Sequence, residues 1–169
     1  MMRVIDNFLT SYELNEYHSV FSKMAFSQSY DNSNKVNERY KSFATKKNLF
    51  SLDQLDDHEK YIYLKLQKNN LLYADEVLKA IFYNALRVGD KFEWHKDWAG
   101  HTFLLYVNKI WYPHWGGSTF LKDFPFSKRI LPSPGRLLIF KGTTLHKGSA
   151  PSIFNQAFAR YSLVYQFTK

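Results

Sequence analysis

Residues 160–167 read RYSLVYQF, and their alternating character predicts a β-strand that lies between two different environments. Arg160 and Ser162 fall on one face of this strand. The opposite face is apolar throughout and consists of Tyr161, Leu163, Tyr165 and Phe167. Since an apolar face has to be covered by other elements, this run predicts one strand of a layered β fold.

The same period of two continues upstream to about residue 80, in short runs rich in β-branched and aromatic residues. Turn residues separate the runs, as at Gly89-Asp90, Gly116-Gly117 and Gly142. The runs read IFYNALRV, KFEWHKDW, TFLLYVN, STFL, RLLIF and RYSLVYQF. Several short strands of this kind predict a β-sandwich or jelly roll.

The first half of the chain has helical spacing instead. The expected elements are a short strand at Arg3 to Ile5, a helix capped by Ser11 and running to about Phe26, a loop over 28–48, a helix capped by Asp53 and running to about Gln67, and a short third helix over 75–79. The predicted fold is therefore mainly β. It is a double-stranded β-helix, or cupin-like jelly roll, over 80–169, with a helical part over 1–79 whose helices pack on one outer face.

The composition fits a single domain over 1–169 and limits the chemistry of any site. Hydrophobic residues make up 45% of the chain and aromatic residues 18%, which is enough for one core. There is no cysteine, so disulfides and thiolate ligands are excluded and any metal must be held by histidines and carboxylates. No apolar run is long enough to span a membrane. We expect a soluble protein of the reducing cytoplasm that has no membrane partner.

The net charge of +8 is compatible with two interpretations. It would attract anionic partners such as nucleic acid or an acidic cosubstrate. Scattered lysines, among them Lys46, Lys47 and Lys96, would also keep an aromatic-rich protein soluble. We favour the second interpretation.

The run WHKDW at 94–98 contains a candidate metal-binding pair, because His95 and Asp97 project to the same face of a strand. A His-x-Asp pair often arises by chance, so a third ligand is required, and His146 after the run RLLIF is the preferred candidate. The competing histidines are His101 and His114. Two histidines and one carboxylate form the facial triad of non-haem Fe(II) oxygenases, which leaves coordination positions open.

Arg160 and Tyr106 are candidates for binding an acidic cosubstrate. A 2-oxo acid that fills two open positions leaves one for O2, and its distal carboxylate then needs a cation inside the barrel. The planar guanidinium of Arg160 matches a carboxylate, and the hydroxyl of Tyr106, in the run TFLLYVN, is expected within reach of it. Without this context, Arg160 would be an ordinary surface residue of a strand.

The ordered series H-x-D, Y-x-N, W-G-G, P-G-R, H and R-x-S extends over Tyr83 to Phe167. This series resembles the 2-oxoglutarate and Fe(II)-dependent dioxygenases, specifically their prolyl 4-hydroxylase-like branch, and the chain is similar to small oxygenases encoded by tailed phages and marine bacteria. The site residues that the resemblance implies are His95, Asp97 and His146 for iron, and Arg160, Tyr106 and Ser162 for 2-oxoglutarate.

The implied activity is hydroxylation of a substrate C–H bond, with conversion of 2-oxoglutarate and O2 to succinate and CO2 and with ascorbate in support. A prolyl residue of a peptide or protein is the expected substrate, and a nucleobase, a nucleic acid or a small metabolite is the alternative. Two other classes remain open: a non-catalytic jelly-roll binding or structural module, and a cupin-type zinc or manganese enzyme without 2-oxoglutarate. The N-terminal third matches no motif, and SIFNQAF, between His146 and Arg160, looks like a small loop insertion.

Overall fold

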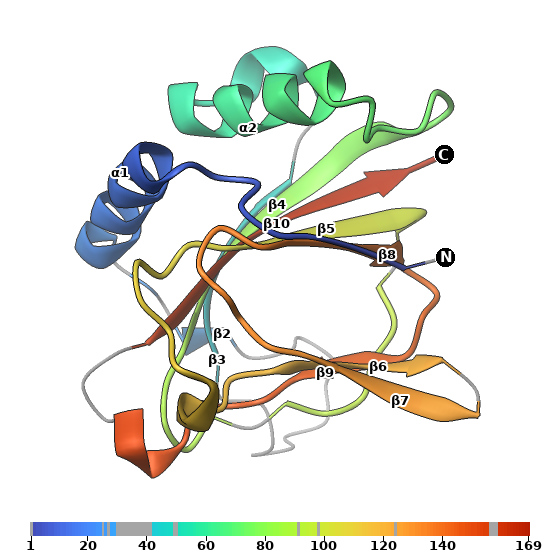
Figure 1. The fold of residues 1–169 in the computed structure, drawn as a ribbon. Coiled ribbons are helices and arrows are strands. Elements are labelled where there is room, and N and C mark those ends of the chain that lie inside the picture. Colours follow the sequence, from blue (N-terminus) through green and yellow to red (C-terminus); the bar gives the residue numbers. More distant parts are fainter. Residues whose placement is uncertain are drawn as a thin grey trace.

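The computed structural model describes residues 2–24, 26, 28–29, 42–48, 51–90, 92–97, 99–123, 125–155 and 159–169. The strands among them are β1 (Arg3–Ile5), β2 (Gln28–Ser29), β3 (Ser42–Asn48), β4 (Val77–Leu86), β5 (His101–Tyr106), β6 (Thr119–Asp123), β7 (Phe126–Ile130), β8 (Leu137–Lys141), β9 (His146–Gly148) and β10 (Arg160–Thr168). They form a seven-stranded sheet ordered β1-β8-β5-β10-β4-β3-β2 and a three-stranded sheet ordered β7-β6-β9. Helices α1 (Ser11–Lys23) and α2 (Asp57–Lys68) lie on the side of the larger sheet that faces away from the smaller one (Figure 1). This arrangement confirms the predicted jelly roll with helices on one outer face.

β10 lies inside the larger sheet, paired antiparallel with β4 and β5. Its apolar face contributes Leu163, Tyr165 and Phe167 to the core that also contains the buried sides of α1 and α2. Its other face contributes Val164 to a second apolar cluster, which includes Leu121 of β6. The alternation in RYSLVYQF is therefore an alternation between two cores, and the Arg160 end of the second face lies between the sheets.

Both helices begin with a capping box, but not at the predicted residues. Thr10 rather than Ser11 caps α1, because its hydroxyl oxygen accepts the backbone N–H of Glu13 at 3.3 Å. The carboxylate of Glu13 in turn accepts the backbone N–H of Thr10 at 2.6 Å. Asp56 caps α2 in the same way, and the predicted cap Asp53 lies in a preceding 3-10 turn. α1 also ends earlier than predicted. In the part of the chain that the structure describes, no helix has the length and hydropathy needed to cross a membrane.

Two predictions for the N-terminal half were wrong. Within the predicted loop, residues 28–29 and 42–48 form β2 and β3, whereas 30–41 lie outside the described residues. Residues 75–79 form no helix, since β4 begins at Val77 and its first residues alternate between exposed and buried. The backbones of β3 and β4 pair with each other, and β4 also pairs with β10. Pairing with distant strands therefore outweighed the local composition.

Glu13 connects the two helices and makes their packing sensitive to acid. Its carboxylate accepts hydrogen bonds from Tyr61 and Lys65 of α2 and from Thr10. Burial raises the pKa of Glu13, but these hydrogen bonds outweigh it and bring the pKa from 4.5 down to about 2. A carboxyl with a lowered pKa stabilises the folded chain above its unfolded pKa, and this contribution disappears as the pH falls toward the folded value.

We therefore expect the Tm to decrease as the pH falls from 4.5 toward 2, and Glu13→Gln to flatten this part of the profile. Thermal melts followed by circular dichroism measure both curves. Parallel profiles for the two proteins over this range would contradict the role given to Glu13.

Candidate active site

His95, Asp97 and His146 converge at one edge of the smaller sheet. His146 begins β9, and His95 faces it in an isolated β-bridge in which each backbone N–H donates to the other carbonyl at 2.9 Å. Nε2 of His95 lies 3.8 Å from Oδ1 of Asp97, and Nε2 of His146 lies 3.6 Å from Oδ2. One ligand atom from each residue lies within 4.8 Å of the other two. The predicted ligands thus meet, although residues 92–97 form only this bridge and not the predicted strand.

The two imidazoles present Nε2 to this centre. Nδ1 of His95 lies 3.0 Å from the carbonyl of Glu93, and Nδ1 of His146 lies 2.9 Å from the carbonyl of Thr144. A carbonyl oxygen can only accept, so Nδ1 carries the hydrogen and the lone pair of Nε2 is available to a metal. Burial lowers the pKa of His146 despite the opposing effect of Asp97, which favours the neutral ring that a metal ion requires.

Asp97 is held by two hydrogen bonds at the neighbouring ends of the paired strands β5 and β8. Its backbone N–H donates to the carbonyl of Gly142 at 2.9 Å. The hydroxyl of Thr102, on β5, donates to Oδ2 at 2.6 Å. Thr102 is buried, at 2% exposure, so this hydrogen bond is shielded from water. This contact between Thr102 and Asp97 was not predicted from the sequence.

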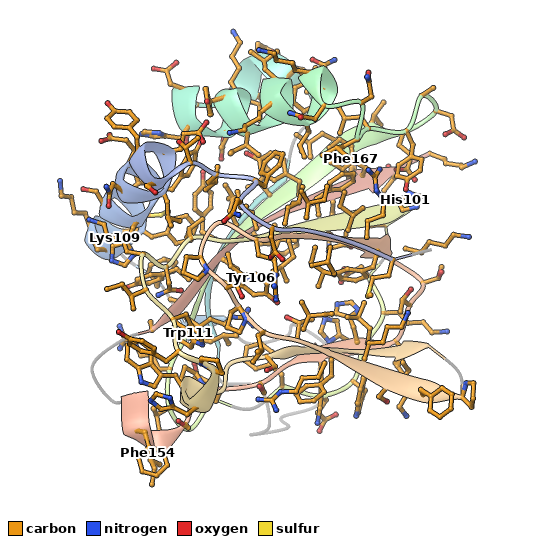
Figure 2. The ribbon with its side chains drawn as sticks, in the orientation of Figure 1. His101, Tyr106, Lys109, Trp111, Phe154 and Phe167 are labelled. Atoms are coloured by element: carbon orange, nitrogen blue, oxygen red, sulfur yellow. The ribbon has the colours of Figure 1, made fainter. Side chains whose placement is uncertain are left out.

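These three side chains fit a divalent metal ion. Bonds of about 2.1 Å from an ion to a nitrogen and an oxygen place those atoms roughly 3–3.6 Å apart, close to the separations found around Asp97. His101 and His114 do not take part. His101 lies at the opposite end of β5 from Tyr106 (Figure 2), and its Nδ1 is 2.9 Å from the carboxylate of Glu76. His114 stacks on Tyr112.

Arg160 lies between the sheets, buried to 2% exposure. Its terminal nitrogens donate to the carbonyl of Gly117 at 3.2 Å and to the hydroxyl of Ser162 at 3.1 Å, while Nε has no hydrogen-bond partner among the described residues. No carboxylate in the described part of the chain pairs with it, and burial lowers the pKa of its guanidinium. A buried cation that lacks a protein anion is suited to an anionic ligand.

Gly117 is required where the chain passes Arg160. Its φ is +70°, and a Cβ there would lie 2.8 Å from the ring of Trp111. Any other residue would strain the backbone here and push against the Trp111 ring. The W-G-G motif of the sequence therefore has a backbone role here.

Tyr106 lies between the two sheets (Figure 2), where it contacts Arg160. The Cζ atom of Arg160 is 5.4 Å from the centre of the Tyr106 ring. The Tyr106 hydroxyl donates to Thr119 at 2.7 Å, and burial raises the pKa of Tyr106. Ser162 pairs with Tyr106 on one side and with Asn84 of β4 on the other, so these residues form a row on the inner face of three strands. Thr119 was missed because only the folded chain brings it to Tyr106.

Asn108 holds the start of β10 in place. Its side-chain amide donates to the carbonyl of Ala159 at 2.8 Å and accepts the backbone N–H of Tyr161 at 2.7 Å. Ala159 and Tyr161 are the chain neighbours of Arg160. Asn108 therefore orients the backbone that carries the guanidinium, a role that the Y-x-N motif alone did not indicate.

Comparison with known proteins identifies the family of this chain. Residues 79–167, more than half of the chain, match the family model described as the 2OG-Fe(II) oxygenase superfamily. This range contains the His–Asp–His cluster as well as Arg160 and Tyr106. The chain belongs to the 2OG-Fe(II) oxygenase superfamily. It is a dioxygenase that depends on Fe(II), 2-oxoglutarate and O2, as predicted. No curated protein matches the chain in sequence.

Solved structures of prolyl hydroxylases share the fold of this 2OG-Fe(II) oxygenase. A Pseudomonas putida prolyl-4-hydroxylase is 18% identical, with a TM-score of 0.73 over 99% of this chain and 92% of that chain. A prolyl hydroxylase from Trichoplax adhaerens, in complex with a peptide fragment of the hypoxia inducible factor oxygen degradation domain, is also 18% identical, with a TM-score of 0.71 over 99% and 83%. The viral collagen prolyl hydroxylase of Paramecium Bursaria Chlorella virus-1 is 17% identical, with a TM-score of 0.64 over 98% and 94%. At these identities, the likeness establishes a fold of the prolyl 4-hydroxylase type.

Thr102 offers a direct test of how the oxygenase site is organised. Thr102→Val removes the hydroxyl that donates to Asp97 and keeps the shape of the side chain. Loss of a partner in the outer shell of a metal site weakens metal affinity by about 10–100-fold, and we expect a decrease of this size for Co(II), followed by its absorption spectrum. Thr102→Ser should restore most of the affinity. Equal affinities in all three proteins would show that the hydrogen bond does not position Asp97.

Proposed function

We propose that this oxygenase hydroxylates a prolyl residue in a peptide or protein. In this proposal His95, Asp97 and His146 hold Fe(II), and Arg160 binds the distal carboxylate of 2-oxoglutarate. The observation that carries the assignment of the site is the buried guanidinium of Arg160, which lacks a carboxylate partner among the described residues and lies inside the same barrel as the His–Asp–His cluster.

The residues around Arg160 suit a carboxylate. Ser162 and the Gly117 carbonyl hold two of its nitrogens, so the orientation of the guanidinium is set before a ligand arrives. A guanidinium group that is already oriented loses less side-chain entropy when a carboxylate binds, and it forms charge-assisted hydrogen bonds with that carboxylate. Tyr106 adds a hydroxyl that can turn from Thr119 toward the ligand, because Thr119 can in turn donate to Tyr106.

These positions indicate what the bound groups and the protein residues each contribute to the reaction. Bound Fe(II), 2-oxoglutarate and O2 supply the oxidation, in which 2-oxoglutarate loses CO2 to become succinate and a substrate C–H bond becomes C–OH. The protein directs Nε2 of both imidazoles toward the metal through the carbonyls of Glu93 and Thr144. It also orients the Asp97 carboxylate through Thr102 and keeps the Arg160 side chain away from water. His95, whose side chain is 44% exposed, lies on the open side of the cluster, where a substrate can approach.

The choice of a prolyl substrate is supported by the shared fold of several proteins that are themselves prolyl hydroxylases, one of them in complex with a peptide. The test is incubation with Fe(II), ascorbate, 2-oxoglutarate and a library of proline-containing peptides, with succinate and peptide mass as readouts. We expect succinate to form together with peptides that gain one oxygen on proline, and Asp97→Ala to form neither product. Oxidation of an oligonucleotide or of a small metabolite in place of the peptides would overturn the prolyl assignment.

A further inference from the structure

The outer face of the smaller sheet carries a cluster of cations and aromatic rings, which we call the basic face. Phe120 of β6 pairs with Arg129 of β7 on one side and with Lys147 of β9 on the other, so the three form a row across the sheet. Paired residues of antiparallel strands share a face. Lys122 lies two residues beyond Phe120 on the same face. Trp94, in the segment that bridges β9, completes the basic face.

The basic face points away from the interior of the barrel. Leu121 and His146, which are the chain neighbours of Phe120 and Lys147, are buried on the opposite face. Both helices lie beyond the larger sheet, on the far side of the molecule from β6, β7 and β9 (Figure 1). Lys122 and Arg129 are exposed, and Phe120, Lys147 and Trp94 are half-buried.

The cations of the basic face lie close together, and none of them forms an ion pair with a carboxylate in the described part of the chain. The Nζ atoms of Lys122 and Lys147 lie 5.0 and 5.1 Å from the centre of the Trp94 ring, so two positive charges are held against one indole. Arg129 donates to the hydroxyl of Ser118 through Nε, which leaves its terminal nitrogens for other contacts. Among the described residues, no carboxylate forms an ion pair with any of these three cations. Like charges at close range repel, and an anion bound among them would relieve this repulsion.

The arrangement favours carboxylates over nucleic acid bases as the ligand. Proteins that bind single strands offer aromatic rings on which bases stack. Here, the ammonium groups of Lys122 and Lys147 already contact the Trp94 ring. Nζ of Lys147 also lies 5.8 Å from the centre of the Phe120 ring. The rings thus fix the positions of the cations, and ammonium and guanidinium groups bind the carboxylates of Asp and Glu side chains.

The basic face is next to the candidate iron ligands along two segments of chain. Trp94 precedes His95 in the bridging segment, and Lys147 follows His146 in β9, so these two residues of the basic face adjoin the ligands in the chain and point to the other side. We propose that the basic face binds an acidic segment of the polypeptide whose prolyl residue is hydroxylated, a proposal that rests on the function proposed above. The acidic segment crosses the sheet along the row from Lys147 to Arg129, and the target residue enters at the His95 side.

Fluorescence anisotropy with three labelled probes tests this proposal without turnover. The probes are a glutamate-rich peptide with a central proline, its glutamine counterpart and a single-stranded oligothymidylate. We expect the glutamate-rich peptide to bind best, and Lys122→Glu with Lys147→Glu to weaken its binding by roughly tenfold. The matched control is Lys60→Glu with Lys68→Glu on the exposed side of α2, which makes the same charge change and should leave binding nearly unaltered.

Tighter binding of the oligothymidylate than of the acidic peptide would overturn the proposal in favour of a nucleic acid. Equal binding of the two peptides, or equal effects of the two double variants, would overturn it as well. Failure here is separable from failure of the proposed function, because peptide hydroxylation is read by mass. Hydroxylation of neutral peptides without any preference for acidic ones would refute the basic face alone. Selective binding of acidic peptides at the basic face, without hydroxylation of any peptide, would refute the prolyl activity.

Discussion

Asp97→Ala is expected to abolish iron binding at working concentrations while the jelly roll remains folded. Asp97 is the carboxylate of the cluster, and its two oxygens face the Nε2 atoms of His95 and His146. Because loss of a mere outer-shell partner weakens a metal site by about 10–100-fold, loss of the carboxylate itself should cost at least about 100-fold in Fe(II) affinity. Isothermal titration with Fe(II) under anaerobic conditions, or with Co(II), measures the change.

His146→Ala should have the same effect on metal affinity, together with a modest decrease in Tm, since His146 is buried and its ring lies 4.6 Å from that of Phe140. The matched control is His114→Ala, which removes an exposed histidine outside the cluster. Circular dichroism distinguishes loss of metal from loss of fold. An unchanged metal content in both Asp97→Ala and His146→Ala would refute the assignment of the ligands.

Arg160→Ala should raise the KM for 2-oxoglutarate by about 30-fold or more. Removal of one member of a buried charge pair typically costs about 2–5 kcal/mol of binding free energy. Each 1.4 kcal/mol corresponds to about a tenfold change in affinity. Succinate formation at increasing 2-oxoglutarate concentration measures the KM, and titration of the Mn(II)-loaded protein with 2-oxoglutarate measures binding directly. Fe(II) affinity in the absence of 2-oxoglutarate should remain within a few-fold of the wild type.

Arg160→Lys controls for the loss of volume in this buried position. Lysine retains the charge but lacks the fork that bonds Ser162 and the Gly117 carbonyl, so an intermediate KM is expected. Arg136→Ala is a second control, because Arg136 is committed to Asp6 at 2.6 Å and to the carbonyl of Leu131 at 3.0 Å. A KM that is the same in Arg160→Ala as in the wild type would mean that 2-oxoglutarate is bound elsewhere.

The predictable parts of this structure have a local signature. Alternation in RYSLVYQF revealed the two faces of β10, because side chains of a strand alternate whatever the strand pairs with. Each of the capping boxes of α1 and α2 lies within four consecutive residues, and both helices were predicted, with errors in the cap and in the end of α1. The H-x-D spacing placed His95 and Asp97 together, since two residues of one extended segment cannot lie far apart.

Contacts over long distances in sequence could not be predicted in this way. β3 has a polar sequence that predicts a loop, and it is a strand because β4 offers it a free edge. β7 is exposed along nearly its whole length and forms because β6 lies next to it. The hydrogen bond from Tyr106 to Thr119 and the clamp of Asn108 around Arg160 likewise join segments that are separate in the sequence.

By itself, the sequence determined the class of fold, the absence of thiolate chemistry and a His-x-Asp pair that needed a third ligand. The tertiary structure decided which histidine lies beside this pair, through the backbone bridge between His95 and His146. It also decided that Arg160 is buried away from any described carboxylate. The physical reason is the same in both cases: a strand pattern specifies which face a side chain occupies, whereas strand pairing specifies what lies opposite that face.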